Sequence, residues 1–139
     1  MADTIDLELA ELVEEFEFLG DWEERYRHLI DLGRQLAPLT DAERNDENKV
    51  RGCASQVWLV RDPDQAGRLF WRGDSDAHIV RGLIAVVLKL YNGHTAADAG
   101  GFDAAAGLSA LGLNEALSTQ RSNGLKAMLA RIAADAKAG

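Results

Sequence analysis

One thiol in the sequence is suited to covalent chemistry. Cys53 is the only cysteine among 139 residues, and it lies in segment 51–56. Gly52 before it permits a tight or left-handed turn, and Lys49 and Arg51 would favour the nucleophilic thiolate. A single cysteine can neither close an internal disulfide nor supply the several thiolates of a zinc or iron–sulfur site. Cys53 therefore acts alone or with a thiol of another molecule, unless it is simply a small buried hydrophobic residue.

No other residue pattern predicts a catalytic or cofactor site. His28, His78 and His94 are scattered along the chain and lack the spacing of metal ligands. His78 lies nearest to a motif described below, but a Cys–His pair forms in space and not by sequence spacing. The sequence has no glycine-rich phosphate loop of the Walker type and no Ser/His/Asp motif. We therefore expect the protein alone to bind no metal and no cofactor.

The composition is that of an ordinary globular protein, with 47% hydrophobic and 27% charged residues. A chain of 139 residues fits one domain, so a single domain over residues 1–139 is expected. The formal net charge of −8 argues against a general affinity for nucleic acids or anionic membranes. No stretch approaches the roughly 18 apolar residues that cross a bilayer, and the N-terminus is acidic where a signal peptide is basic. A cytoplasmic protein is expected.

The first third of the chain predicts two helices and a loop. Apolar residues at helical spacing predict a helix over 4–19, which Thr4 can cap. Asp21, followed three residues later by Glu24, resembles a capping box that opens a second helix. That helix is expected to end before Pro38. The polar run that follows, residues 40–49, has no periodic apolar face and predicts a surface loop.

The segments around the thiol predict a small antiparallel sheet. Residues 56–60 are rich in β-branched and aromatic types, residues 63–67 are a turn signal, and residues 68–72 supply a second run. Together they predict a hairpin. A shorter strand at 49–51 is expected to join it, which puts Cys53 at a turn between two strands. A thiol at a turn is within reach of a partner, whereas a thiol inside a strand usually is not.

The rest of the chain predicts helices that cover this sheet. Segment 77–91 is apolar on most sides and predicts the central helix of the core, capped by Ser75 or Asp76. Segment 95–117 predicts short helices, and a last helix begins near residue 122. Polar residues are expected near the starts of the short helices: Asp98, Asp103 and Asn114. The fold class is therefore α+β, an antiparallel sheet of about three strands flanked by helices.

The residues around the thiol resemble the signature of SufE, the sulfur acceptor that works with SufS-type cysteine desulfurases. The resemblance rests on segment 50–58, which reads VRGCASQVW in one-letter code. Further blocks resemble SufE segments in the same order: 21–26, 73–77 with 79–84, and 121–125. The matching blocks span the chain from about residue 19 to residue 134. The resemblance implies the α+β fold that SufE shares with IscU.

The resemblance also implies a mechanism. In this family a pyridoxal-phosphate-dependent desulfurase of the SufS or CsdA type strips sulfur from free cysteine and holds it as a persulfide. Cys53 would attack the outer sulfur, become a persulfide itself and deliver the sulfur to an iron–sulfur scaffold. The protein would stimulate the desulfurase as a co-catalyst, with no small-molecule turnover of its own. Small residues at 52, 54 and 55 would let the loop hide the sulfur and swing outward on docking. Ala54 departs from the larger polar residue, often glutamine, expected at its position.

The resemblance also implies roles for residues outside the cysteine loop. Arg121 matches the family arginine that opens the last helix and would face the desulfurase, although a solvated arginine fits the position equally well. Asp74 lies in the Gly-Asp-Ser-Asp-Ala block and would line the loop, unless it serves only as a helix cap. The candidate partner-binding or loop-supporting residues are Arg51, Gly52, Ser55, Asp74 and Arg121, around the catalytic Cys53. Two other functions stay open: a docking activator without sulfur transfer, and a thiol redox sensor.

Overall fold

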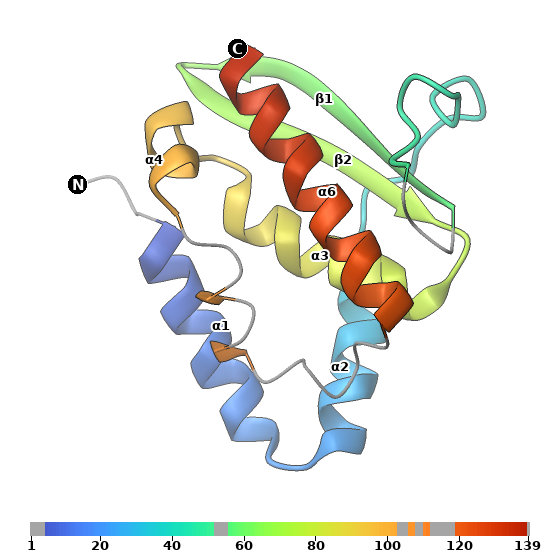
Figure 1. Ribbon diagram of the computed structural model, residues 1–139. Helices are drawn as coiled ribbons and strands as arrows, with labels where there is room; N and C mark the ends of the chain where they lie inside the picture. Colours follow the sequence, from blue (N-terminus) through green and yellow to red (C-terminus); the bar gives the residue numbers. More distant parts are fainter. Residues whose placement is uncertain (1–4, 52–55, 103–105, 108–109, 112–118, 139) are drawn as a thin grey trace.

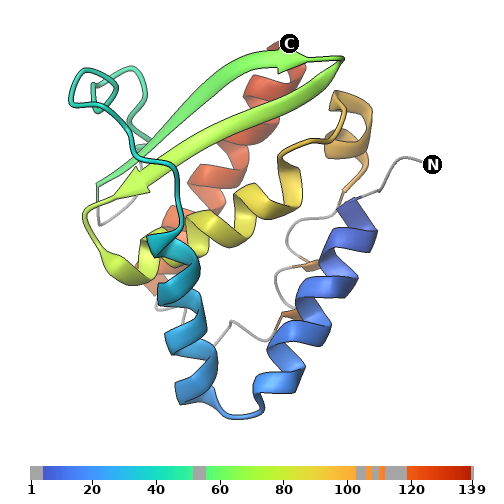
Figure 2. The same cartoon turned by 180° about the vertical axis from the view of Figure 1, so that it is seen from behind.

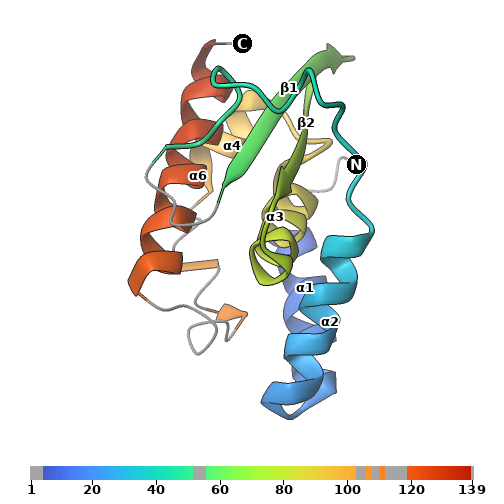
Figure 3. The same cartoon turned by 90° about the vertical axis from the view of Figure 1, so that its right-hand side faces the viewer.

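The structure is a computed structural model that describes residues 5–51, 56–102, 106–107, 110–111 and 119–138 (Figure 1). Helices and a small antiparallel sheet make up the fold, which confirms the predicted α+β class. Along the chain the elements are α1 (Ile5–Leu19), α2 (Trp22–Arg34), β1 (Val57–Gln65), β2 (Arg68–Ser75), α3 (His78–Tyr91), α4 (Ala96–Gly101) and α6 (Thr119–Ala138). Figure 3 shows α6 on one side, α1 and α2 on the other, and the sheet with α3 between them.

The two N-terminal helices form where the apolar spacing predicts them. α1 buries Ile5, Leu12 and Phe16, which recur at helical intervals. Asp21 caps α2, because its Oδ1 accepts a hydrogen bond of 2.8 Å from the backbone N–H of Glu24. This bond satisfies one of the N–H groups that a helix start leaves unpaired. Both predicted helices and the predicted cap at Asp21 are confirmed, while Thr4, the predicted cap of the first helix, lies outside the described residues.

The sheet is a hairpin whose strands are longer than the sequence predicts. Pairing runs from Val57 opposite Ser75 to Gln65 opposite Arg68, and the turn residues Ala66 and Gly67 both have positive φ. Two positive φ angles belong to the hairpin turn that matches strand twist. The register shifts between residues 62 and 65, a stretch that contains proline at 63. Proline cannot donate to a ladder and is tolerated at such an irregularity, so pairing continues beyond it.

The predicted third strand is reduced to a bridge. Lys49 forms an isolated antiparallel bridge with Trp58, and residues 49–51 belong to neither described strand. Upstream, the chain is held in turns by its own polar side chains: the backbone N–H of Asn48 donates to Asn45 Oδ1 at 2.9 Å, and the side-chain amide of Asn48 donates to the carbonyl of Glu43 at 2.8 Å. These local bonds compete with strand formation. Among the described residues the sheet therefore has two strands, where about three were expected.

α3 is the central helix, as predicted, and begins at His78. Its buried residues lie on most of its sides: Ile79, Gly82, Leu83, Ile84, Val86, Val87, Leu88, Leu90 and Tyr91. The predicted cap is wrong, because the N-cap residue is Ala77 and no side chain caps the helix. Figure 2 shows the hairpin from behind, with α3 and the two N-terminal helices below it.

α2 and α3 cross with their backbones in contact. A Cβ added at Gly82 would lie 2.3 Å from the carbonyl oxygen of Leu29, and one added at Gly33 would lie 2.7 Å from the backbone nitrogen of Gly82. Real Cβ atoms essentially never approach other atoms this closely. Glycine at both positions therefore sets the separation of the two helices.

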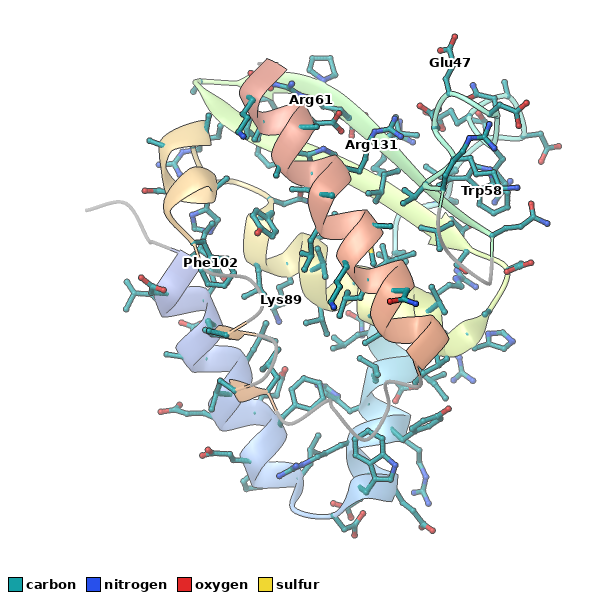
Figure 4. The ribbon with its side chains drawn as sticks, in the orientation of Figure 1. Glu47, Trp58, Arg61, Lys89, Phe102 and Arg131 are labelled. Carbon is teal, nitrogen blue, oxygen red and sulfur yellow. The ribbon has the colours of Figure 1, made fainter. Side chains whose placement is uncertain are left out.

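α6 lies across the sheet and fixes the far side of the core. Leu125, Met128 and Ile132 are buried, and the helix begins at Thr119, a few residues earlier than expected. Figure 4 shows Arg61 of β1 beside Arg131 of α6. Arg61 donates to the carbonyl of Asp135, while Arg131 donates to the carbonyl of Glu47 at 2.8 Å. These bonds join the last helix to the hairpin and to the 40–49 loop.

The outer edge of β2 is closed by the residues that follow α3. The backbone N–H of Trp71 donates to Asn92 Oδ1 at 2.8 Å, and Asn92 Nδ2 donates back to the carbonyl of Trp71 at 3.0 Å. Two residues earlier, Leu69 makes two backbone hydrogen bonds of 2.9 Å, one with Gly93 and one with His94. The side chain of Asn92 thus occupies the place of one residue of a further strand.

The remaining predictions concern short helices and the membrane. Thr95 caps α4, because its Oγ1 accepts from the backbone N–H of Asp98 at 3.2 Å. Asp103 and Asn114 lie outside the described residues. Within the part of the chain that the structure describes, no helix is long and apolar enough to cross a membrane.

Candidate functional site

The segment that carries the thiol joins β1 to the loop before it. Cys53, Gly52 and Ser55 lie outside the described residues, so the site is built from the residues on either side. Upstream of the segment, Val50 donates its backbone N–H to the carbonyl of Val57 at 2.8 Å. Upstream of Val50, the carbonyl of Asn48 accepts from the N–H of Leu59 at 2.9 Å. The two flanks of residues 52–55 are therefore held side by side.

A second set of bonds holds the downstream flank against the start of α3. The backbone N–H of Gln56 donates to Asp76 Oδ1 at 3.0 Å, and the N–H of Asp76 donates to the carbonyl of Gln56 at 3.3 Å. Ser75 is buried, and its Oγ accepts from the N–H of Ala77 at 3.2 Å. The turn between β2 and α3 thus lies directly beside Gln56, the downstream flank.

Asp74 lies at the base of this turn and joins three parts of the chain. Its side chain is only 13% exposed, and its Oδ2 accepts from Arg44 Nη2 at 2.9 Å. Its Oδ1 accepts from the N–H of Ser75 at 2.8 Å and lies 3.1 Å from Arg81 Nε. Arg81 Nε makes no hydrogen bond, so its contact with Asp74 is an ion pair only. Asp74 therefore links the 40–49 loop, the end of β2 and the first turn of α3.

The other predicted site residues are placed only in part. Arg51 is exposed, directly before the segment that carries Cys53. Arg121 lies in the first turn of α6, and its side chain is outside the described part. Their functional roles, like that of Asp74, stay predictions.

The 40–49 loop is tied to the sheet by a charged cluster that the sequence did not reveal. Arg72 of β2 makes paired hydrogen bonds to Glu43 of the loop, at 2.9 and 2.5 Å, and to Asp62 of β1, at 3.0 and 3.1 Å. The hydrogen bonds from Arg72, followed by one from the backbone of Thr40, lower the pKa of Glu43 to about 2. The bonds to Glu43 and Asp62 raise the pKa of Arg72 well above its ordinary value. Both groups are therefore charged at neutral pH.

Sequence reasoning missed Asp76 and Arg44 as parts of this site. The sequence favours Asp76 as a cap of α3, whereas the residue bonds to Gln56, twenty residues away. Arg44 lies in a polar run whose partners are visible only in three dimensions. The one signal in the sequence is that Asp76 lies in the matching block 73–77, two residues after Asp74.

The described flanks of Cys53 offer neither a metal centre nor a large cavity. Among the described residues there is no group of three or more histidine, cysteine, aspartate or glutamate side chains that could hold a metal ion. A groove of about 510 Å³ lies between α2, α3 and β2, and one of about 730 Å³ lies between α4 and α6. Neither is lined by Arg51, Gln56 or Asp76. The described flanks, Arg51 and Gln56, are exposed at the surface.

Known proteins resemble this chain over most of its length. The chain is 51% identical over 133 residues to an uncharacterized SufE-like protein of Rhizobium etli, and the match covers 93% of this chain and 89% of that protein. It is 45% identical over 132 residues to an uncharacterized SufE-like protein of Rhizobium meliloti, with 93% and 94% covered. The solution structure of a hypothetical protein from Thermus thermophilus has the same fold, with a TM-score of 0.76, 18% identity and coverage of 94% and 93%.

The family itself is shown by a match over most of the chain. Residues 10–136 match the family described as "SufE: Fe-S metabolism associated domain". The match includes both flanks of Cys53 and the turn between β2 and α3. The protein therefore belongs to the SufE family, whose domain is associated with iron–sulfur metabolism.

Proposed function

We propose that this protein is a sulfur acceptor that carries sulfur as a persulfide on Cys53. The donor is a pyridoxal-phosphate-dependent cysteine desulfurase of the SufS or CsdA type, which the protein stimulates, and the sulfur goes on to an iron–sulfur scaffold. Membership of the SufE family supports this assignment. The observation that carries it is that the chain's only thiol lies in a four-residue segment whose two flanks are pinned by hydrogen bonds at 2.8 and 3.0 Å.

The proposed step is a thiol–persulfide exchange. The Cys53 thiolate attacks the outer sulfur of the desulfurase persulfide, and a new S–S bond forms to that sulfur. The S–S bond within the desulfurase persulfide breaks, and its electron pair leaves on the desulfurase cysteine as a thiolate. One sulfur atom changes partner without any net oxidation or reduction. The step therefore needs no metal, external oxidant or cofactor on this chain.

The surrounding structure supports a carrier that works by docking. Both flanks of the segment are fixed to the sheet and to the start of α3, while the large grooves lie elsewhere. A short segment between two fixed points can be presented to another protein without disturbing the core. The protein then acts as a co-catalyst, because it forms a covalent intermediate only together with its partner.

Intact-mass measurement tests the proposal directly. After incubation with a SufS-type desulfurase and cysteine, the protein should gain the mass of one sulfur atom, and a reductant should remove it. Cys53→Ser should fold with an unchanged circular dichroism spectrum, gain no sulfur and fail to stimulate sulfide release. Wild-type protein whose thiol has been blocked with iodoacetamide is the matched control, and it should behave like the serine variant.

Each alternative function gives a different result in the same experiment. If Cys53→Ser still stimulates the desulfurase fully, the protein is a docking activator without sulfur transfer. If the wild-type protein gains oxygen in the presence of peroxide, but no sulfur with desulfurase and cysteine, it is a thiol redox sensor. Either outcome would overturn the proposal.

A further inference from the structure

One backbone N–H on the outer edge of β2 has no acceptor among the described residues. The residues of β2 that point away from β1 are Leu69, Trp71, Gly73 and Ser75. Leu59, which stands opposite Gly73, donates its N–H to Asn48 on the far side of β1, so this pair exchanges no hydrogen bonds. Within the set on β2, each N–H except that of Gly73 donates to a described acceptor. No described group donates to the carbonyl of Gly73 either.

Gly73 is buried, which makes its two unpaired backbone groups unusual. More than about 90% of the buried backbone N–H and C=O groups in proteins have a hydrogen-bond partner. Gly73 lines the groove of about 510 Å³ between α2, α3 and β2. Sites for small ligands typically have volumes of about 300–1,000 Å³. The groove therefore has room for a ligand that supplies both an acceptor and a donor to Gly73.

Lys89 is the charged side chain of this groove that has no ion pair within the described part of the chain. The other charged residues that line the groove, Asp62 and Arg72, hydrogen-bond to each other, and Arg72 also bonds to Glu43. Their charges are therefore already compensated. Lys89 is exposed and lies three residues before Asn92, at the end of α3. A negative charge on the ligand is favoured at this end of the groove.

Asn92 limits how far an added chain can follow the edge of β2. Its side-chain amide takes both backbone groups of Trp71, and Trp71 is two residues, roughly 7 Å, from Gly73. A chain that pairs with Gly73 must therefore end, or leave the edge, before it reaches Trp71. In an antiparallel chain the carboxyl end lies on the Trp71 side. That is also the side on which Lys89 and Asn92 line the groove.

We propose that this groove binds the C-terminal end of an extended peptide whose last residue is apolar. One peptide residue accepts the N–H of Gly73 and donates to its carbonyl, as in the addition of a strand to a sheet edge. The terminal carboxylate pairs with Lys89. The last side chain packs against the apolar residues that line the groove: Leu32, Leu36, Phe70 and Leu88. The inference does not depend on the proposed transfer of sulfur.

Hydrogen exchange of the Gly73 amide, followed by nuclear magnetic resonance, tests the site directly. The probe is a short N-acetylated alanine peptide that ends in leucine with a free carboxylate. It is added to the full chain at up to about 10 mM, because a few hydrogen bonds give weak binding. At saturation the exchange of Gly73 should slow at least about fivefold, as expected for one new hydrogen bond. The same peptide with an amidated end should bind about two- to fivefold more weakly.

Two variants of the groove and one control locate the binding. Lys89→Met should weaken binding of the free-carboxylate peptide about two- to fivefold and leave the amidated peptide unaffected. Lys126→Met is the matched control, because Lys126 is an exposed lysine of α6 that does not line this groove. Ala85 is half-buried and lines the groove from α3. Ala85→Leu should keep the circular dichroism spectrum of the wild type and lose the protection of Gly73 by the peptide.

The inference is overturned if the peptide leaves the exchange of Gly73 unchanged, or if Gly73 in the free protein is already as protected as Trp71. Equal binding of the free and amidated peptides would overturn the role of the carboxylate, and an equal loss in Lys126→Met would assign it to general electrostatics. Unchanged binding by Ala85→Leu would place the peptide elsewhere. Protection of Gly73 that rises with protein concentration, without peptide, would assign the groove to a second copy of the chain and would overturn the inference too.

Discussion

Replacing Gly82 with alanine should separate α2 from α3 and destabilise the protein. The added methyl group would lie 2.3 Å from the carbonyl oxygen of Leu29 and 2.8 Å from its carbonyl carbon, where ordinary contacts begin near 3.4 Å. The helices must therefore move apart by about 1 Å, the difference between 2.3 and 3.4 Å. No side-chain rotation relieves the clash, because both atoms belong to the backbone of α2.

The size of the effect follows from two opposing terms. Overpacking in a well-packed core costs about 1–3 kcal/mol, and a clash with backbone belongs at the upper end of that range. Alanine in a helix interior is favoured over glycine by about 1 kcal/mol. We therefore expect the free energy of unfolding to fall by about 2 kcal/mol. The displaced helix also carries Arg81, the partner of Asp74 beside the cysteine segment.

Urea unfolding followed by circular dichroism measures the change. Gly100→Ala is the matched control, because Gly100 lies in α4 and an added Cβ would meet nothing within 4 Å. The control should be as stable as the wild type or slightly more so. If Gly82→Ala unfolds at the same urea concentration as the wild type, the reasoning from the close backbone approach is wrong.

Two further predictions concern charge and the reactivity of the thiol. Glu43→Gln should be less stable than the wild type at neutral pH. The difference in stability should fade as the pH falls from about 4.5 towards about 2, because the pKa of Glu43 is depressed in the native protein and its contribution to stability is lost as the carboxylate is protonated. A constant difference across acid unfolding curves would contradict this. Native Cys53 should react more slowly with iodoacetamide than a urea-unfolded control, and Asp74→Asn should speed the reaction by weakening the ion pairs with Arg44 and Arg81. Equal alkylation rates for native and unfolded protein would refute the prediction that Cys53 is sheltered in the native protein.

The helices and the hairpin could be predicted because their causes are local. The apolar spacing of α1, the cap at Asp21 and the apolar sides of α3 each depend on residues within a few positions of one another. The same holds for the turn at Ala66 and Gly67, although the strands around it extend further than their β-branched residues indicate. Pairing with a neighbour stabilises residues such as Gly73 and Asp74, which have low strand propensity of their own.

The bonds around the candidate site could not be predicted, because they join distant parts of the chain. Arg72 meets Glu43 at a separation of 29 residues, and Arg44 meets Asp74 at a separation of 30. Charged residues in a polar loop carry no signal of which partner they meet. Asp76 shows the limit most clearly, since its local context favours a helix cap and its actual partner is Gln56. The sequence directs attention to the thiol only through its uniqueness and the family signature around it.

The amide of Asn92 has a consequence for how the protein behaves at high concentration. A strand edge with free N–H and C=O groups offers a template on which another chain can add a strand, which leads to aggregation. At Trp71 both groups are already taken by one side chain, at 2.8 and 3.0 Å. An added strand would itself have a free backbone edge on its outer side, whereas the side-chain amide of Asn92 presents none. Solubility of this two-stranded sheet thus depends in part on a single asparagine outside it.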